Sequence, residues 1–111
     1  MTINLFDLFL ILFLHWVADF ILQTDWQAKN KSSNNVALLA HTSVYSVVWL
    51  AFGIKFTLIT LVAHTITDYI TSRITKRLWE NKDVHNFFVV VGFDQLLHYT
   101  QLILTYYYLD L

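Results

Sequence analysis

The sequence predicts an all-α fold, a four-helix transmembrane bundle with both termini on the non-cytoplasmic side. Hydrophobic residues make up 57% of the 111 residues, proline is absent, and the apolar residues gather in four long stretches. Each stretch has about the length of a bilayer-spanning helix, roughly 17–25 residues. None shows the alternating pattern of a β-barrel strand. We therefore expect one domain, 1–111, with helices over about 3–24, 36–53, 56–79 and 85–109.

The distribution of basic residues predicts the orientation of these helices. Lys55 belongs to the second connection, and the other six basic residues lie in or beside the first and third connections: Lys29, Lys31, Arg73, Lys76, Arg77 and Lys82. Because cytoplasmic loops are enriched in lysine and arginine, we expect those two connections in the cytoplasm and a multi-pass protein of the inner (cytoplasmic) membrane, with the lipid bilayer as its partner. Trp26 and Trp79 then fall at the cytoplasmic interface, and Trp49, Tyr106, Tyr107 and Tyr108 fall at the outer one, where aromatic residues anchor membrane proteins.

Composition excludes several classes of function. The net charge is −1 and the basic residues form no strong patch, so no nucleic-acid partner is expected. The chain has no cysteine, which excludes disulfides, thiolate ligands and cysteine nucleophiles. Its two glycines form no phosphate-binding loop.

Histidines and aspartates recur four residues apart within the predicted helices. The pairs are His15 with Asp19, His64 with Asp68, and Asp94 with His98, and a further histidine is His41. Residues four apart share one helix face. An ionised aspartate at the centre of a membrane helix costs roughly 2.5–3.5 kcal/mol, so these groups need compensation. At a rise of about 1.5 Å per residue they fall in one layer, roughly 8–20 Å from the cytoplasmic face.

Imidazole nitrogens and carboxylate oxygens at one depth predict a site for a divalent transition metal. Zn²⁺ is favoured over Mn²⁺ and Fe²⁺, and the number of ligands suits one or two ions. The candidate ligands are His15, Asp19, His41, His64, Asp68, Asp94 and His98. Asp19, Asp68 and Asp94 are also candidate catalytic residues, as ligands or as the general base.

Polar residues around this set are candidates for substrate binding. Gln23 and Gln95 would orient ligands or contact a substrate, or else pack between helices. Asp25, Lys29, Lys31 and Arg73 would steer a lipid head group or a small anionic substrate, or else only determine topology.

Three functions remain open on these residues. The leading one is a metal-dependent hydrolase of a membrane-proximal or lipid-linked substrate. The second is a small transporter or channel-like protein that uses the same residues for ion binding or proton relay, with a homo-oligomer able to line a pore. The third is a phage-encoded modulator of a host membrane protein. Hydrogen bonding between helices is the purely structural reading.

Four segments carry a resemblance to a known family: HWVADFILQTDWQAKNK (15–31), LLAHTSVY (38–45), HTITDYITSR (64–73) and FFVVVGFDQLLH (87–98). Together they resemble a family of small bacterial and phage integral-membrane proteins, domain of unknown function 3307, over nearly the whole chain and in matching order. This resemblance implies a membrane protein but no particular reaction. HTITDYIT is also similar to the H-x-x-x-D helix of membrane-bound metal-dependent hydrolases, although the paired histidines at the start of those proteins are absent here.

Overall fold

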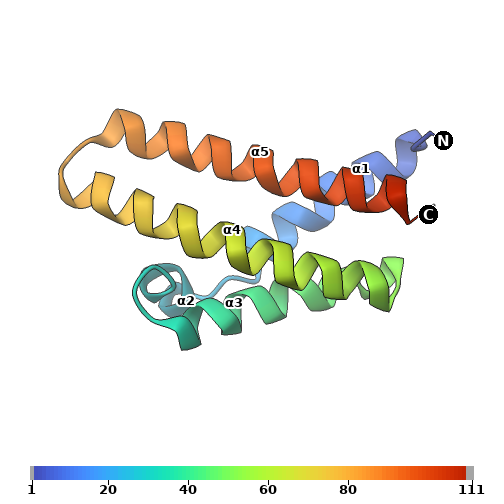
Figure 1. Ribbon diagram of the computed structural model, residues 1–111, viewed down its shortest axis with the longest axis horizontal. Helices are drawn as coiled ribbons and strands as arrows, with labels where there is room; N and C mark the ends of the chain where they lie inside the picture. The colour runs from blue at the N-terminus through green and yellow to red at the C-terminus, as the bar shows by residue number, and fades with distance from the viewer. Residues whose placement is uncertain (1, 110–111) are drawn as a thin grey trace.

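The computed structural model describes residues 2–109, and within them every regular element is helical. The elements are α1 (Leu5–Trp16), the π-helix η1 (Val17–Ile21), α2 (Asp25–Asn30), α3 (Asn35–Val47), the 3₁₀-helix η2 (Val48–Phe52), α4 (Ile54–Glu80) and α5 (Val84–Tyr108). Figure 1 shows α4 and α5 as an antiparallel pair, with α3 along α4 and α1 beside α5. The start of α1 and the end of α5 share one end of the molecule, which we call the terminal end, and α2 and the α4–α5 turn form the opposite loop end (Figure 1). The all-α class is therefore confirmed.

The first connection contains a helix that the sequence analysis treats as a loop. Thr24 accepts a hydrogen bond from the backbone N–H of Gln27, and the Gln27 side chain accepts one from the backbone N–H of Thr24. This reciprocal capping box satisfies two of the free donors at a helix start. It explains why α2 forms within a polar segment.

The expected helix over 3–24 is not a single α-helix. Regular α-helical bonding ends at Trp16, and the next five residues form η1, in which the N–H of Leu22 bonds to the carbonyl of Val17 at 2.9 Å. A π-helical turn inside a helix frequently marks a functional site. Here it carries the buried Asp19.

Within residues 2–109, two segments are long and apolar enough to cross a membrane, Asn35–Phe52 and Val84–Tyr108. This assessment rests on length and composition alone, and α1 and α4 do not meet the same measure. Large apolar side chains nevertheless cover the outside of the molecule, among them Phe6 at 74% exposure and Val62 at 60%.

The apolar core lies toward the terminal end. Trp49 is fully buried and its ring centroid lies 5.6 Å from that of Phe56 and 5.9 Å from that of Phe52. Tyr106 is also buried, and its hydroxyl donates a hydrogen bond to Asp7. The assignment of Trp49 and Tyr106 to an exposed aromatic belt is therefore wrong, because both rings pack between helices.

Candidate functional site

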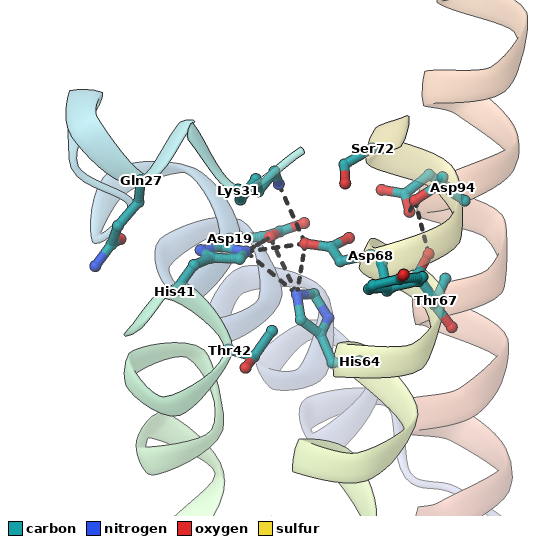
Figure 2. A network of polar contacts seen from close by, with 12 residues as sticks. Asp19, Gln27, Lys31, His41, Thr42, His64, Thr67, Asp68, Ser72 and Asp94 are labelled. Atoms are coloured by element: carbon teal, nitrogen blue, oxygen red, sulfur yellow. Dashed lines mark hydrogen bonds and ion pairs between the residues drawn. The ribbon is translucent and has the colours of Figure 1, made fainter. Parts of the chain in front are cut away.

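Four buried side chains converge in the half of the molecule toward the loop end. Asp19 comes from η1, His41 from α3, and His64 and Asp68 from successive turns of α4 (Figure 2). Each is at most 4% exposed. One ligand atom from each of the four lies within 4.8 Å of the other three. We call this group the four-residue cluster.

The distances inside the four-residue cluster suit a common ion. His41 Nε2 lies 2.9 Å from Asp19 Oδ1, 3.2 Å from Asp68 Oδ2 and 3.3 Å from His64 Nε2. His64 Nε2 lies 3.5 Å from Asp19 Oδ1 and 3.3 Å from Asp68 Oδ2. Ligand atoms of a tetrahedral ion with bonds of about 2.0–2.2 Å are separated by about 3.3–3.6 Å. The residues present could therefore hold a metal ion.

The bonding of Asp19 Oδ1 also points to a ligand rather than to a hydrogen-bond acceptor. This oxygen is buried and close to two imidazoles, yet it accepts no hydrogen bond of acceptable geometry from any residue in the 2–109 range. A buried carboxylate oxygen without a donor is costly, since it has lost its water. A cation bound at the convergence of the nitrogens would satisfy it.

Asp68 links the four-residue cluster to a second group of possible metal ligands, Asp19, Asp94 and His98, of which the last two lie on α5. Its Oδ1 accepts a hydrogen bond from His98 Nε2 at 3.1 Å, on the opposite oxygen from the one that faces His41 and His64. His98 Nε2 also lies 3.1 Å from Asp94 Oδ1. Ligand atoms of Asp19, Asp94 and His98 all lie within 4.8 Å of one another.

His15 occupies a different position from the other histidines. Its Nε2 is 2.6 Å from Gln95 Oε1 and its Nδ1 is 2.8 Å from the Tyr45 hydroxyl. The amide oxygen can only accept, so Nε2 carries the proton and Nδ1 accepts from the phenol. Gln95 Nε2 in turn donates to Asp94 Oδ2 at 3.2 Å and to Asp19 Oδ2 at 3.5 Å. This chain of bonds makes His15 a neutral residue that positions Gln95, with both ring nitrogens already used.

A loop lysine covers the cluster from the loop end. Lys31 Nζ lies 3.1 Å from Asp68 Oδ2 (Figure 2). Burial opposes the charge of this ammonium, but the carboxylates of Asp68 and Asp19 outweigh burial and raise the pKa of Lys31 above its ordinary value. Lys31 is therefore a fixed positive charge beside the cluster at neutral pH.

A cavity of about 570 Å³ reaches the polar residues from outside. Its polar wall contains four carboxylates, two amides and two lysines: Asp19, Asp68, Asp94, Glu80, Gln23, Gln95, Lys31 and Lys76. Its apolar wall is formed mainly by aromatic residues: Phe20, Trp79, Phe87 and Phe88. This volume is typical of small-molecule sites. The cavity thus joins a polar wall that contains the carboxylates to an apolar, largely aromatic wall.

The other candidate substrate residues lie outside this cavity lining. Asp25 and Lys29 are exposed on α2. Arg73 donates to Asn35 Oδ1 at 3.0 Å and stacks on Tyr69 of its own helix. It lines a separate hollow with Ser32 at the molecular surface. The placement of these three residues adds no support for substrate contact.

Two residues of the site are absent from the sequence-based candidates. Tyr45 is fully buried, stacks on His64 with ring centroids 3.7 Å apart, and bonds to His15. Thr71 donates to Asp94 Oδ1 at 2.6 Å. Tyr45 follows His41 by four residues, so the spacing that paired the histidines with aspartates could have identified it.

Comparison with known proteins places the chain in a family. The family described as "Protein of unknown function (DUF3307)" matches residues 7–110. No curated protein and no solved structure matches the chain. The match includes every residue of the four-residue cluster and of the second group on α5. The chain therefore belongs to the DUF3307 family of proteins of unknown function.

Proposed function

We propose that this chain is a multi-pass protein of the inner (cytoplasmic) membrane that binds a divalent transition metal ion at the four-residue cluster and hydrolyses a membrane-proximal or lipid-linked substrate. The ion is Zn²⁺ in preference to Mn²⁺ or Fe²⁺, given two imidazole and two carboxylate ligands. The observation that carries the proposal is the position of this cluster on the wall of an amphipathic cavity.

The distribution of polar and apolar side chains supports membrane insertion of all four long helical segments. The interior is polar, with four fully or almost fully buried histidines, while phenylalanine and valine side chains cover the outside. A soluble protein of this size rarely exposes so much contiguous apolar surface. In lipid, the same arrangement keeps the polar groups inside the bundle and leaves the apolar surface in contact with acyl chains. The basic residues near the loop end then favour a cytoplasmic location for it.

The cavity supports a substrate with a polar head and an apolar chain. Trp79 and Phe88, on its apolar wall, are 58% and 61% exposed, so this wall reaches the outer surface of the helices. Lys31, on the polar wall, presents a positive charge beside Asp68. An anionic head group would therefore bind near Lys31, with the attached apolar chain against the aromatic wall.

The chain's own residues supply the remaining parts of a hydrolytic site. A bound metal ion would activate water at neutral pH and polarise the bond to be cleaved. Asp94 lines the cavity, where its Oδ1 is held by Thr71 and its Oδ2 by Gln95. A carboxylate fixed in this way at the cavity wall is suited to serve as the general base when the four-residue cluster alone holds an ion. Lys31 would bind the negative charge of the substrate.

One observation favours the transporter alternative. Buried polar residues continue from the four-residue cluster toward the terminal end, where Gln101 donates to Thr60 at 3.2 Å and to Thr105 at 2.9 Å. Beyond them the Tyr106 hydroxyl bonds to Asp7. Such a row of polar side chains could relay protons through the bundle. The cavity of about 570 Å³ lies at the loop end, and none of these residues lines it.

Metal content tests the proposal directly. The wild-type protein is purified in detergent without chelators, and its metal is measured by elemental mass spectrometry beside that of His64→Ala. His85→Ala is the matched control, because His85 is an exposed histidine outside both metal-ligand groups. We expect near-stoichiometric metal in the wild type and in the control, and its loss in His64→Ala. Wild-type protein that stays metal-free after incubation with Zn²⁺ would contradict the proposal and favour the relay.

A further inference from the structure

We infer that the site holds two metal ions, bridged by the carboxylates of Asp19 and Asp68, and that the second ion binds together with an anionic group. This inference rests on the proposed function, since the first ion is the one assigned to the four-residue cluster. The second position lies between Asp19, Asp68, Asp94 and His98, and we call it the α5 position. Three of its four ligands belong to the second group described above, and Asp68 completes it.

The two oxygens of Asp68 face different partners. Oδ2 faces the imidazoles of His41 and His64, at 3.2 and 3.3 Å, while Oδ1 faces that of His98 at 3.1 Å. A carboxylate whose two oxygens meet separate sets of imidazoles has the arrangement needed to bridge two cations.

Asp19 is divided in the same manner. Its Oδ1 is the oxygen near His41 and His64, and it lacks a hydrogen-bond donor. Its Oδ2 lies 3.6 Å from His15 Nε2 and 3.5 Å from Gln95 Nε2. Gln95 also bonds to Asp94 and thereby holds both carboxylates toward the α5 position. Helical bundles build two-metal carboxylate sites from facing helices in a comparable way.

The charges of the site explain why an anion should accompany the second ion. Asp19, Asp68 and Asp94 contribute three negative charges, and Lys31 contributes one positive charge. One divalent ion therefore brings the site to neutrality with neutral histidines. A second divalent ion would leave an excess positive charge in a buried site, which is costly unless an anion enters with it. The cavity beside Lys31 gives such an anion access, and a phosphate-bearing substrate has the required charge.

Mn²⁺ binding in the presence and absence of inorganic phosphate tests this inference. Metal-free full-length protein in detergent is titrated with Mn²⁺, the bound ions are counted by elemental mass spectrometry, and exchange coupling between them is measured by electron paramagnetic resonance. With phosphate we expect two ions per chain and a spectrum of coupled ions. Without phosphate we expect one ion and an uncoupled spectrum.

Variants at the two positions separate this inference from the proposed function. His98→Gln keeps an amide donor for Asp68 but removes the imidazole of the α5 position, so it should bind one ion with phosphate present. Asp94→Asn is the second variant for that position, and circular dichroism checks that both remain helical. A contrary result would be one bound ion in the wild type with and without phosphate, kept in His98→Gln and Asp94→Asn but lost in His64→Ala. That result would overturn the two-ion centre and leave the proposed function standing. No bound ion under any condition would overturn both.

Discussion

Replacement of Lys31 tests where the metal binds, because the ammonium and the proposed ion share one oxygen. Lys31 Nζ lies 3.1 Å from Asp68 Oδ2, which is also the oxygen that faces His41 and His64. Lys31→Met keeps the length of the side chain and removes its charge. Since two cations repel each other, we expect Lys31→Met to bind metal more tightly than the wild type.

The size of this effect follows from the geometry. An ion bonded to Asp68 Oδ2 at about 2.1 Å lies no further than about 5.2 Å from Lys31 Nζ. Repulsion between a double and a single positive charge at about that separation amounts to roughly 1.6 kcal/mol with the dielectric constant of water and roughly 6 kcal/mol with an effective value of 20. The Lys31 side chain is 19% exposed, so solvent screens its charge only in part and the repulsion lies between these two values. We therefore expect a gain of about 1.5–3 kcal/mol, or roughly 10–100-fold in affinity.

Competition with a chelating fluorophore measures this change. Metal-free protein in detergent at neutral pH is titrated with Zn²⁺, and the wild type is compared with Lys31→Met and Lys29→Met. Lys29 is the matched control, because it is exposed on α2 and its charge is screened by solvent. Unchanged or weaker affinity in Lys31→Met would refute binding of the ion at Asp68, whatever the metal content of the wild type.

Three further predictions concern stability and the central carboxylate. The pKa of Lys31 is raised by Asp68 and Asp19 against the opposing effect of burial. Its ion pair therefore stabilises the fold below about pH 10.5, and this stabilisation is lost as pH rises through the raised value. The thermal midpoint of metal-free wild type should fall more steeply above pH 10.5 than that of Lys31→Met, and parallel curves would contradict this. Trp49→Ala removes a fully buried ring and should lower the free energy of unfolding by about 3–5 kcal/mol, seen as a lower thermal midpoint. Trp79→Ala, at a 58% exposed position, should change the thermal midpoint little. Equal effects of the two substitutions would argue against the described core. Asp68→Asn should reduce bound metal at least tenfold by mass spectrometry, because it replaces a charged ligand that contacts three histidines. The control Asp7→Asn, at the terminal end, should leave metal content unchanged. Loss of metal in both variants would indicate a general folding defect.

Hydrophobic length predicts the long helices well. The expected helices over 56–79 and 85–109 correspond to α4 (Ile54–Glu80) and α5 (Val84–Tyr108). Their ends are encoded locally, by Gly53 with a φ of 101° before α4 and by the Asp83 cap before α5. Such signals act within a few residues and can be read without the tertiary structure.

The structure differs from the sequence-based predictions where packing between distant segments determines the conformation or burial of a residue. The register change at η1 has no marker among its five residues, VADFI, and depends on where Asp19 meets α3 and α4. The hydropathy of the segment around Trp49 is the same whether its ring faces lipid or packs on Phe56, so hydropathy alone cannot distinguish a lipid-facing position from a buried one. The Thr24–Gln27 capping box, in contrast, was present as a local pattern and could have predicted α2.

The site shows the same division. Four-residue spacing places His64 and Asp68 on one face of α4, and the structure finds them at 3.3 Å. The separate role of His15 could not be read in this way, because Tyr45 and Gln95 are 30 and 80 residues away in the sequence. Spacing within a helix identifies which residues share a face, but partners on other helices decide which of them remain free to bind an ion.

The uneven hydropathy of the helices has a consequence for biogenesis in the proposed topology. α5 is apolar enough to enter a bilayer alone, whereas α4 carries Asp68 and the basic residues that follow it and does not reach the same measure. A helix that carries a buried carboxylate is inserted more readily once partners for that group are present. We therefore expect α4 to remain at the insertion machinery until α5 has been synthesised, and the two helices to enter the bilayer together. A nascent chain truncated before Val84 would then be retained or degraded rather than integrated.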